Sequence, residues 1–171
     1  GYAFTVWLNP KFAIEQSRSI HQALTRLLPD QAALLDQGLA GLTQSLEQLD
    51  REQEVLFNQL GGRPVLFSHP VYQYLQARYG INGASVHWEP GEMPATSDWI
   101  ELGNILSSHP AGLMLWEDTP LEEVSAKLLE LGIRSIPFHT ASNRPERGDY
   151  LDVMRDNMLR LAQNPAEGGA L

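Results

Sequence analysis

The chain has 171 residues, of which 43% are hydrophobic and 19% are charged, so it is long enough for one domain with a substantial core and too apolar for extended disorder. Its 21 acidic and 12 basic residues give a formal charge of −9 with no basic run, which argues against nucleic acid as a partner. Since cysteine is absent, disulfides and thiolate metal sites are excluded, and no apolar run reaches the roughly 20 residues of a membrane helix.

The first third of the chain predicts two helices. Apolar residues at helical spacing indicate a helix over residues 10–28, which Pro10 is well placed to begin. A second, unusually long helix is expected from Leu35 to Leu60, where a four-three rhythm of leucines is broken only at Gln53 and Gly61-Gly62 ends the helix. The rhythm leaves an isolated coiled coil open, although it favours a helix that lies along one domain.

After Gly62, predicted strands and helices alternate. The strands are expected at 65–67, 84–88, 113–116 and 133–138, and the helices that follow them at 70–79, 97–107, 121–131 and 150–164. Four such units indicate an α/β fold, a single lobe with a four-stranded parallel sheet flanked by helices and preceded by the long helix. The expected organisation of this one lobe is a helical segment at 1–62, the four units at 63–164 and a flexible tail at 165–171. The order of the strands is not encoded in this pattern.

Three side chains able to bind a metal follow the ends of predicted strands: His69 after the first, Glu117 after the third and His139 after the fourth. The carboxyl edge of a parallel sheet is where ligands bind, and two imidazoles with one carboxylate suit zinc. None of them has the local spacing of a metal motif, so this site depends on the fold. Structural roles stay open for each, since His69 could cap a helix, Glu117 could pair with Lys127 and His139 could be solvated.

The sequence marks no catalytic residue and no cofactor-binding motif. Ser68 and His69 are neighbours on an extended segment, where successive side chains point to opposite faces, so they are not expected to form a dyad. There is no nucleophile elbow, phosphate-binding loop or dinucleotide fingerprint. We therefore do not expect an enzyme, and we expect structural roles for His21, His87 and His109.

Several stretches together resemble a known family. They are the long helix, the sequence WLNP at 7–10, FSHPVYQYLQARYG at 67–80, EPGEMP at 89–94 and GDYLDVMRDN at 148–157. They resemble the carboxyl-terminal half of the zinc and manganese solute-binding proteins of bacterial ABC transporters, over nearly the whole chain.

This resemblance implies a two-lobed protein whose lobes are joined by a long helix, with the metal held between them. The chain is similar to the second lobe plus that helix, and His69 matches a ligand of the family. Thr5 stands where the family has a histidine, and His139 replaces an aspartate. The resemblance further implies zinc or manganese as the ligand, a transporter permease as a partner and a periplasmic or extracytoplasmic location, although Gly1 to Thr5 lacks the features of a signal peptide.

Three functions remain open at this stage. The leading hypothesis is a metal-binding lobe related to zinc or manganese uptake, with His69, His139 and Glu117 as ligands. The second is a divergent lobe that has lost metal binding and acts as a docking or regulatory module, which the changes at Thr5 and His139 favour. A metal-dependent hydrolase ranks last, because the sequence marks no further acid or base.

Overall fold

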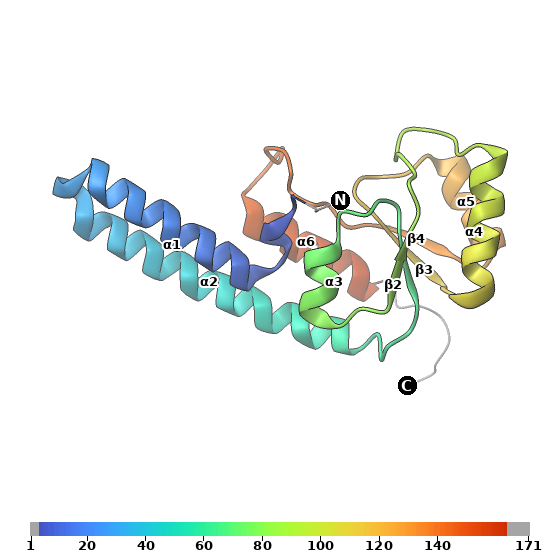
Figure 1. The fold of residues 1–171 in the computed structure, drawn as a ribbon, viewed down its shortest axis with the longest axis horizontal. Helices are drawn as coiled ribbons and strands as arrows, with labels where there is room; N and C mark the ends of the chain where they lie inside the picture. Colours follow the sequence, from blue (N-terminus) through green and yellow to red (C-terminus); the bar gives the residue numbers. More distant parts are fainter. Residues whose placement is uncertain (1–3, 164–171) are drawn as a thin grey trace.

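The computed structural model describes residues 4–163, so the tail predicted at 165–171 lies outside the described residues. Its helical elements and strands alternate after a helical start (Figure 1). In chain order they are the short 3-10 helix η1 (Val6–Leu8), α1 (Pro10–Leu27), η2 (Pro29–Gln31), α2 (Ala32–Asn58), β1 (Val65–Phe67), α3 (Gln73–Tyr79), β2 (Gly83–Ser85), α4 (Thr96–Ser108), β3 (Leu113–Trp116), α5 (Glu122–Glu130), β4 (Arg134–Pro137) and α6 (Tyr150–Gln163).

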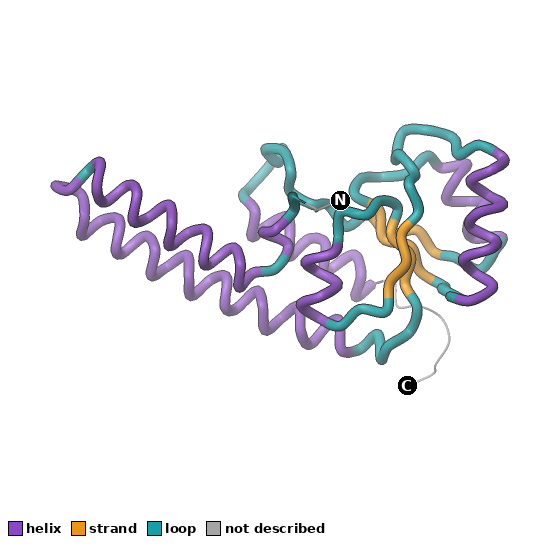
Figure 2. The backbone as a smooth tube through the Cα atoms, viewed as in Figure 1, coloured by secondary structure: helices purple, strands orange, loops and turns teal. Residues whose placement is uncertain are grey.

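The four strands form one parallel sheet in the order β2-β1-β3-β4, which confirms the predicted α/β fold. Figure 2 shows the strands gathered together with helices around them. Successive residues of β1 point to opposite faces, so Phe67 joins the core under α2, α3 and α6, whereas Leu66 joins the core under α4 and α5. Both faces are therefore covered, as is usual for a parallel sheet.

The strand order places a topological switch point between β1 and β3. From β1 the chain passes through α3 to β2 on one side, and it then returns through α4 on the other face to β3. At such a reversal the loops that follow the two central strands diverge and leave a crevice at the carboxyl edge of the sheet. The residues that follow β1 and β3 therefore stand where this class of fold binds ligands.

Helices α1 and α2 lie side by side as a hairpin that projects away from the sheet (Figure 1). The second half of α2 continues along the lobe and packs on α3 and α6, so this half lies along the domain as the sequence favoured, whereas the first half packs on α1. Gln53, which breaks the leucine rhythm, is fully buried. Its Oε1 accepts a hydrogen bond from the Tyr79 hydroxyl at 2.8 Å, whereas its Nε2 has no hydrogen-bond partner among the described residues. Gly61 and Gly62 follow the helix with φ of 59° and 75°, a backbone that disfavours other residues.

Helix α3 begins at Gln73, so the predicted start at Pro70 was wrong. The carbonyl oxygens of residues 69–71 already accept hydrogen bonds from within the turn and from the Thr5 hydroxyl, and they are not available to begin a helix. The first helical hydrogen bond is accepted one residue later, by the Tyr72 carbonyl.

Strand β2 is shorter than the predicted 84–88, although the backbone N–H groups of Val86 and Trp88 still donate to the chain that leaves β1. The other helices after β2 and the strands β1, β3 and β4 agree with the predicted ranges to within one residue at each end. None of the helices within residues 4–163 is both long and apolar enough to cross a bilayer.

Candidate metal centre

Ser68, the residue between β1 and His69, fixes how the neighbouring strand ends lie relative to one another. It is fully buried, and its carbonyl oxygen accepts a hydrogen bond from the N–H of Trp88 at 2.8 Å. Its hydroxyl accepts the N–H of Glu117 at 3.4 Å. The residue before His69 is thus bonded both to the residue before Glu89 and to Glu117 itself, which brings three potential metal ligands to one edge of the sheet.

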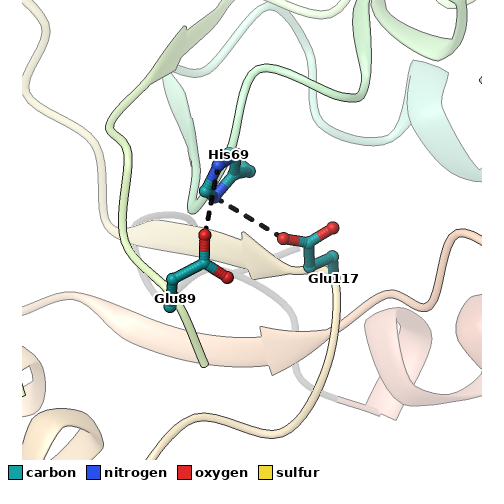
Figure 3. A group of neighbouring side chains, drawn as sticks. All are labelled: His69, Glu89 and Glu117. Atoms are coloured by element: carbon teal, nitrogen blue, oxygen red, sulfur yellow. Dashed lines mark ion pairs between the residues drawn. The ribbon is translucent and has the colours of Figure 1, made fainter. Parts of the chain in front are cut away.

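The side chains of His69, Glu89 and Glu117 converge on one another (Figure 3). Each nitrogen of the His69 ring faces one carboxylate, with Nδ1 3.5 Å from Glu117 Oε1 and Nε2 3.6 Å from Glu89 Oε1. One possible ligand atom from each residue lies within 4.8 Å of the other two. An imidazole nitrogen and two carboxylate oxygens fit zinc, and the share of oxygen also suits manganese.

The charges around Glu117 favour a cation. Partial burial raises the pKa of Glu117, the nearby carboxylates of Glu89 and Asp118 raise it further, and His69 lowers it. The pKa of the buried Tyr72 phenol is also raised, by burial and by the charge of Glu117. Since like charges close to a partly buried carboxylate are unfavourable, a divalent ion at this position would offset them.

His139 faces the same region from the end of β4. A cleft of about 1030 Å³ is lined by Glu89, Glu117, Asp118, His139 and the loop at 140–147. The Nδ1 atom of His139 lies 3.7 Å from Asp118 Oδ1, so this imidazole contacts the residue next to Glu117. Among the described residues it is not part of the convergent group of three.

The structure thus brings together two of the three residues predicted from sequence, His69 and Glu117, and adds one that the sequence reasoning missed. Glu89 follows the extended segment that ends at Trp88, so it stands after β2 much as Glu117 stands after β3. That placement was a usable signal, because residues that follow parallel strands lie at the same edge of the sheet. His87, in the same segment, is exposed, and its ring centre lies 5.7 Å from that of His69.

Lys127, the alternative partner of Glu117, contacts a different residue. The ammonium group of Lys127 lies over the Trp99 ring, 4.1 Å from its centre, whereas the ion pair of Glu117 is with the His69 ring. His21 pairs with an aspartate of α2 at 2.8 Å. His109 follows α4, and its Nε2 lies 3.0 Å from a carbonyl oxygen of β1. Both have the structural roles expected of them.

Thr5 also has a structural role. It is fully buried, and its hydroxyl donates a hydrogen bond to the carbonyl oxygen of Val71 in the turn after His69. The position at which the resemblance expects a histidine therefore contributes to the support of the His69 turn.

Comparison with known proteins gives a family and several solved structures with a similar fold. A family model described as "Zinc-uptake complex component A periplasmic" matches residues 5–164. The Zn(II)-bound ZnuA-like domain of Streptococcus pneumoniae AdcA has a TM-score of 0.82 at 20% identity, covering 93% of this chain and 62% of that one. The metal-dependent lipoprotein YcdH of Bacillus subtilis gives 0.83 at 19% identity, covering 94% of this chain and 64% of its own.

The laminin-binding protein Lbp of Streptococcus pyogenes is similar too, with a TM-score of 0.78 at 19% identity, covering 95% of this chain and 65% of that one. At these identities the likeness establishes the fold. The chain spans less than two thirds of the length of each of the three structures. No curated protein sequence matches it significantly.

Proposed function

This chain belongs to the family of periplasmic zinc-uptake complex components, as the resemblance in its sequence indicated, and on that premise we propose that it is a metal-binding component of an ABC transport system. Its ligand is zinc, with manganese as the second candidate. His69, Glu89 and Glu117 bind the ion, and His139 supplies a further ligand from the same cleft. The convergence of the first three side chains is the observation that carries this proposal.

The ligand set requires a small contraction around the ion. Zinc takes nitrogen and oxygen ligands at about 2.0 to 2.2 Å, whereas the His69 nitrogens lie 3.5 and 3.6 Å from the two carboxylates. These distances start from different ring nitrogens, Nδ1 for Glu117 and Nε2 for Glu89. Because one ion binds only one of the two nitrogens, the carboxylate at the other nitrogen must reach the ion by a side-chain rotation. The Glu89 side chain is 57% exposed and has the freedom to make it.

We further propose that the protein carries the ion to a membrane permease and acts in the periplasm or outside the cytoplasmic membrane. The family description supports this role. Because the solved relatives are longer than this chain, the role belongs to the complete transport protein.

Zinc calorimetry tests the proposal directly. The wild-type chain is expected to bind zinc, while His69→Ala and Glu117→Ala are expected to lose most of the heat of binding. His21→Ala is the matched control, because His21 lies on the hairpin and pairs with α2. Equal heats in the wild type and in His69→Ala would contradict the proposed site, and titration with manganese in competition with zinc ranks the two metals.

The second candidate function is a docking or regulatory module that binds no metal. The hydrogen-bonded, buried Thr5 favours it, because the ligand that the family resemblance expects there is missing. This alternative predicts that elemental analysis finds no metal in protein purified without chelator and that zinc produces no heat of binding.

A further inference from the structure

The backbone of His139 is paired in an unusual way at the edge of the sheet. Strand β4 is an edge strand, and the N–H of Phe138, just beyond it, donates to the Trp116 carbonyl oxygen at 2.6 Å. Since successive residues of a strand present their backbone groups to opposite sides, His139 turns its N–H and C=O away from β3. Asn157 of α6 pairs both groups, with Oδ1 accepting the His139 N–H at 2.9 Å and Nδ2 donating to its carbonyl oxygen at 2.8 Å. This side-chain amide takes the place of a neighbouring strand.

Asn157 is itself fully buried on the apolar side of α6, where Met154 and Leu161 are its buried neighbours. A buried amide is unfavourable unless its hydrogen bonds are made. Arg160 Nη1 also donates to Asn157 Oδ1, at 2.9 Å. Because this atom accepts from two groups that can only donate, the orientation of the amide is set by its chemistry. An apolar side chain would satisfy the packing at this position. The asparagine is therefore explained by its hydrogen bonds to the backbone of His139.

The residues on both sides of His139 are anchored as well, but by other elements. The Tyr72 hydroxyl donates to the Phe138 carbonyl oxygen at 2.6 Å, and Trp7 Nε1 donates to the Thr140 carbonyl oxygen at 2.8 Å. Three successive residues are thus held from α6, from the start of α3 and from η1. A loop that only connected two elements would not need such support.

We propose that Asn157 is a positioning residue, which fixes the backbone of His139 so that its imidazole is presented to the ion bound at the ends of β1 and β3. The inference rests on the proposed function, in which His139 is a ligand. Groups that orient a metal ligand without touching the metal commonly change affinity by about 10- to 100-fold. Asn157 binds the main chain of His139, the proposed metal ligand, and leaves the imidazole ring of His139 free to turn toward the cleft.

The test is a double-mutant cycle on zinc affinity, measured by competition with a chelating dye, together with thermal unfolding of each variant. Asn157→Leu keeps the number and branching of the side-chain heavy atoms and removes both hydrogen bonds to His139, and Asn157→Asp keeps only the acceptor. Tyr150→Phe is the matched control, because it removes another hydrogen bond of α6, the one from the Tyr150 hydroxyl to the Trp7 carbonyl oxygen, and does not touch His139.

Asn157→Leu is expected to weaken zinc binding about 10- to 100-fold, with a smaller loss in Asn157→Asp and none in Tyr150→Phe. In the His139→Ala background the same substitution is expected to have no further effect on affinity, although its effect on stability remains. Equal losses of affinity in both backgrounds, or no loss in either, would overturn the proposal.

Two further outcomes separate this inference from the function on which it rests. If His139→Ala binds zinc as tightly as the wild type, Asn157 has no ligand to position and the inference fails, while the site at His69 and Glu117 stands. If the wild type binds no zinc, both fail. Should Asn157→Leu not fold, Asn157→Asp decides the matter in the same cycle.

Discussion

Glu117→Gln is expected to change stability and metal binding in opposite directions. Because the folded-state pKa of Glu117 is raised, its ionised form is unfavourable to the fold, and stability is lost as the pH rises through that pKa. Glutamine has nearly the same shape and no charge, so it removes this unfavourable contribution at neutral pH. It also removes a carboxylate ligand, so zinc affinity is expected to fall at least about tenfold.

The size of the stability gain follows from the geometry. The ligand atoms of Glu117 and Glu89 lie within 4.8 Å of each other. At that separation two unit charges repel by about 0.9 kcal/mol in bulk water and about 3.5 kcal/mol at an effective dielectric of 20. Since the site is partly exposed and the substitution also loses the attraction to His69, we expect a net gain of about 1 to 2 kcal/mol, or roughly 2 to 8 °C in Tm for a chain of this size.

Thermal unfolding with chelator and then with excess zinc measures both effects. The chelated variant should melt above the chelated wild type, and added zinc should raise its Tm less than it raises that of the wild type. Glu101→Gln, on an exposed position of α4, is the control for the loss of one negative charge. A Glu117→Gln variant that melts lower without metal and keeps the full rise with zinc would refute the reasoning.

Asp50→Ala is expected to lower the free energy of unfolding by about 3 kcal/mol in urea denaturation. The substitution breaks two largely buried hydrogen bonds, of 2.8 and 2.6 Å, from Arg78 of α3 to the Asp50 carboxylate. A loss under about 1 kcal/mol would contradict this expectation. Gly83→Ala is expected to cost about 1 to 3 kcal/mol, since its Cβ would lie 2.2 Å from Phe67 Cε2, while Gly91→Ala, which has open space, should cost much less in the same assay. Zinc affinity should fall as the pH drops through the raised pKa of Glu117, because protons compete with the metal. Calorimetry at neutral and at mildly acidic pH measures this, and tighter binding in acid would argue against Glu117 as a ligand.

The sequence by itself determined most of the elements and two of the three positions of the candidate metal site. Strand β1 was predicted at its observed bounds because three apolar residues are bounded by turn residues, and Gly80 ends α3 with a φ of 62°, as a glycine after a helix commonly does. His69 and Glu117 were found because each lies within two residues of the end of a strand. These features depend on the backbone and on residues close together in the chain, which is the range over which a pattern can be interpreted.

Only the tertiary structure decided which strand ends are neighbours. The order β2-β1-β3-β4 places Glu89 beside His69, and no local pattern contains that order. The start of α3 depends on Thr5, 66 residues away from Val71, and the position of His139 depends on Asn157, 18 residues further along the chain. Hydrogen bonds of this kind form only once the sheet has assembled. For that reason the residues that build the site could be predicted in part, while those that hold it in place could not.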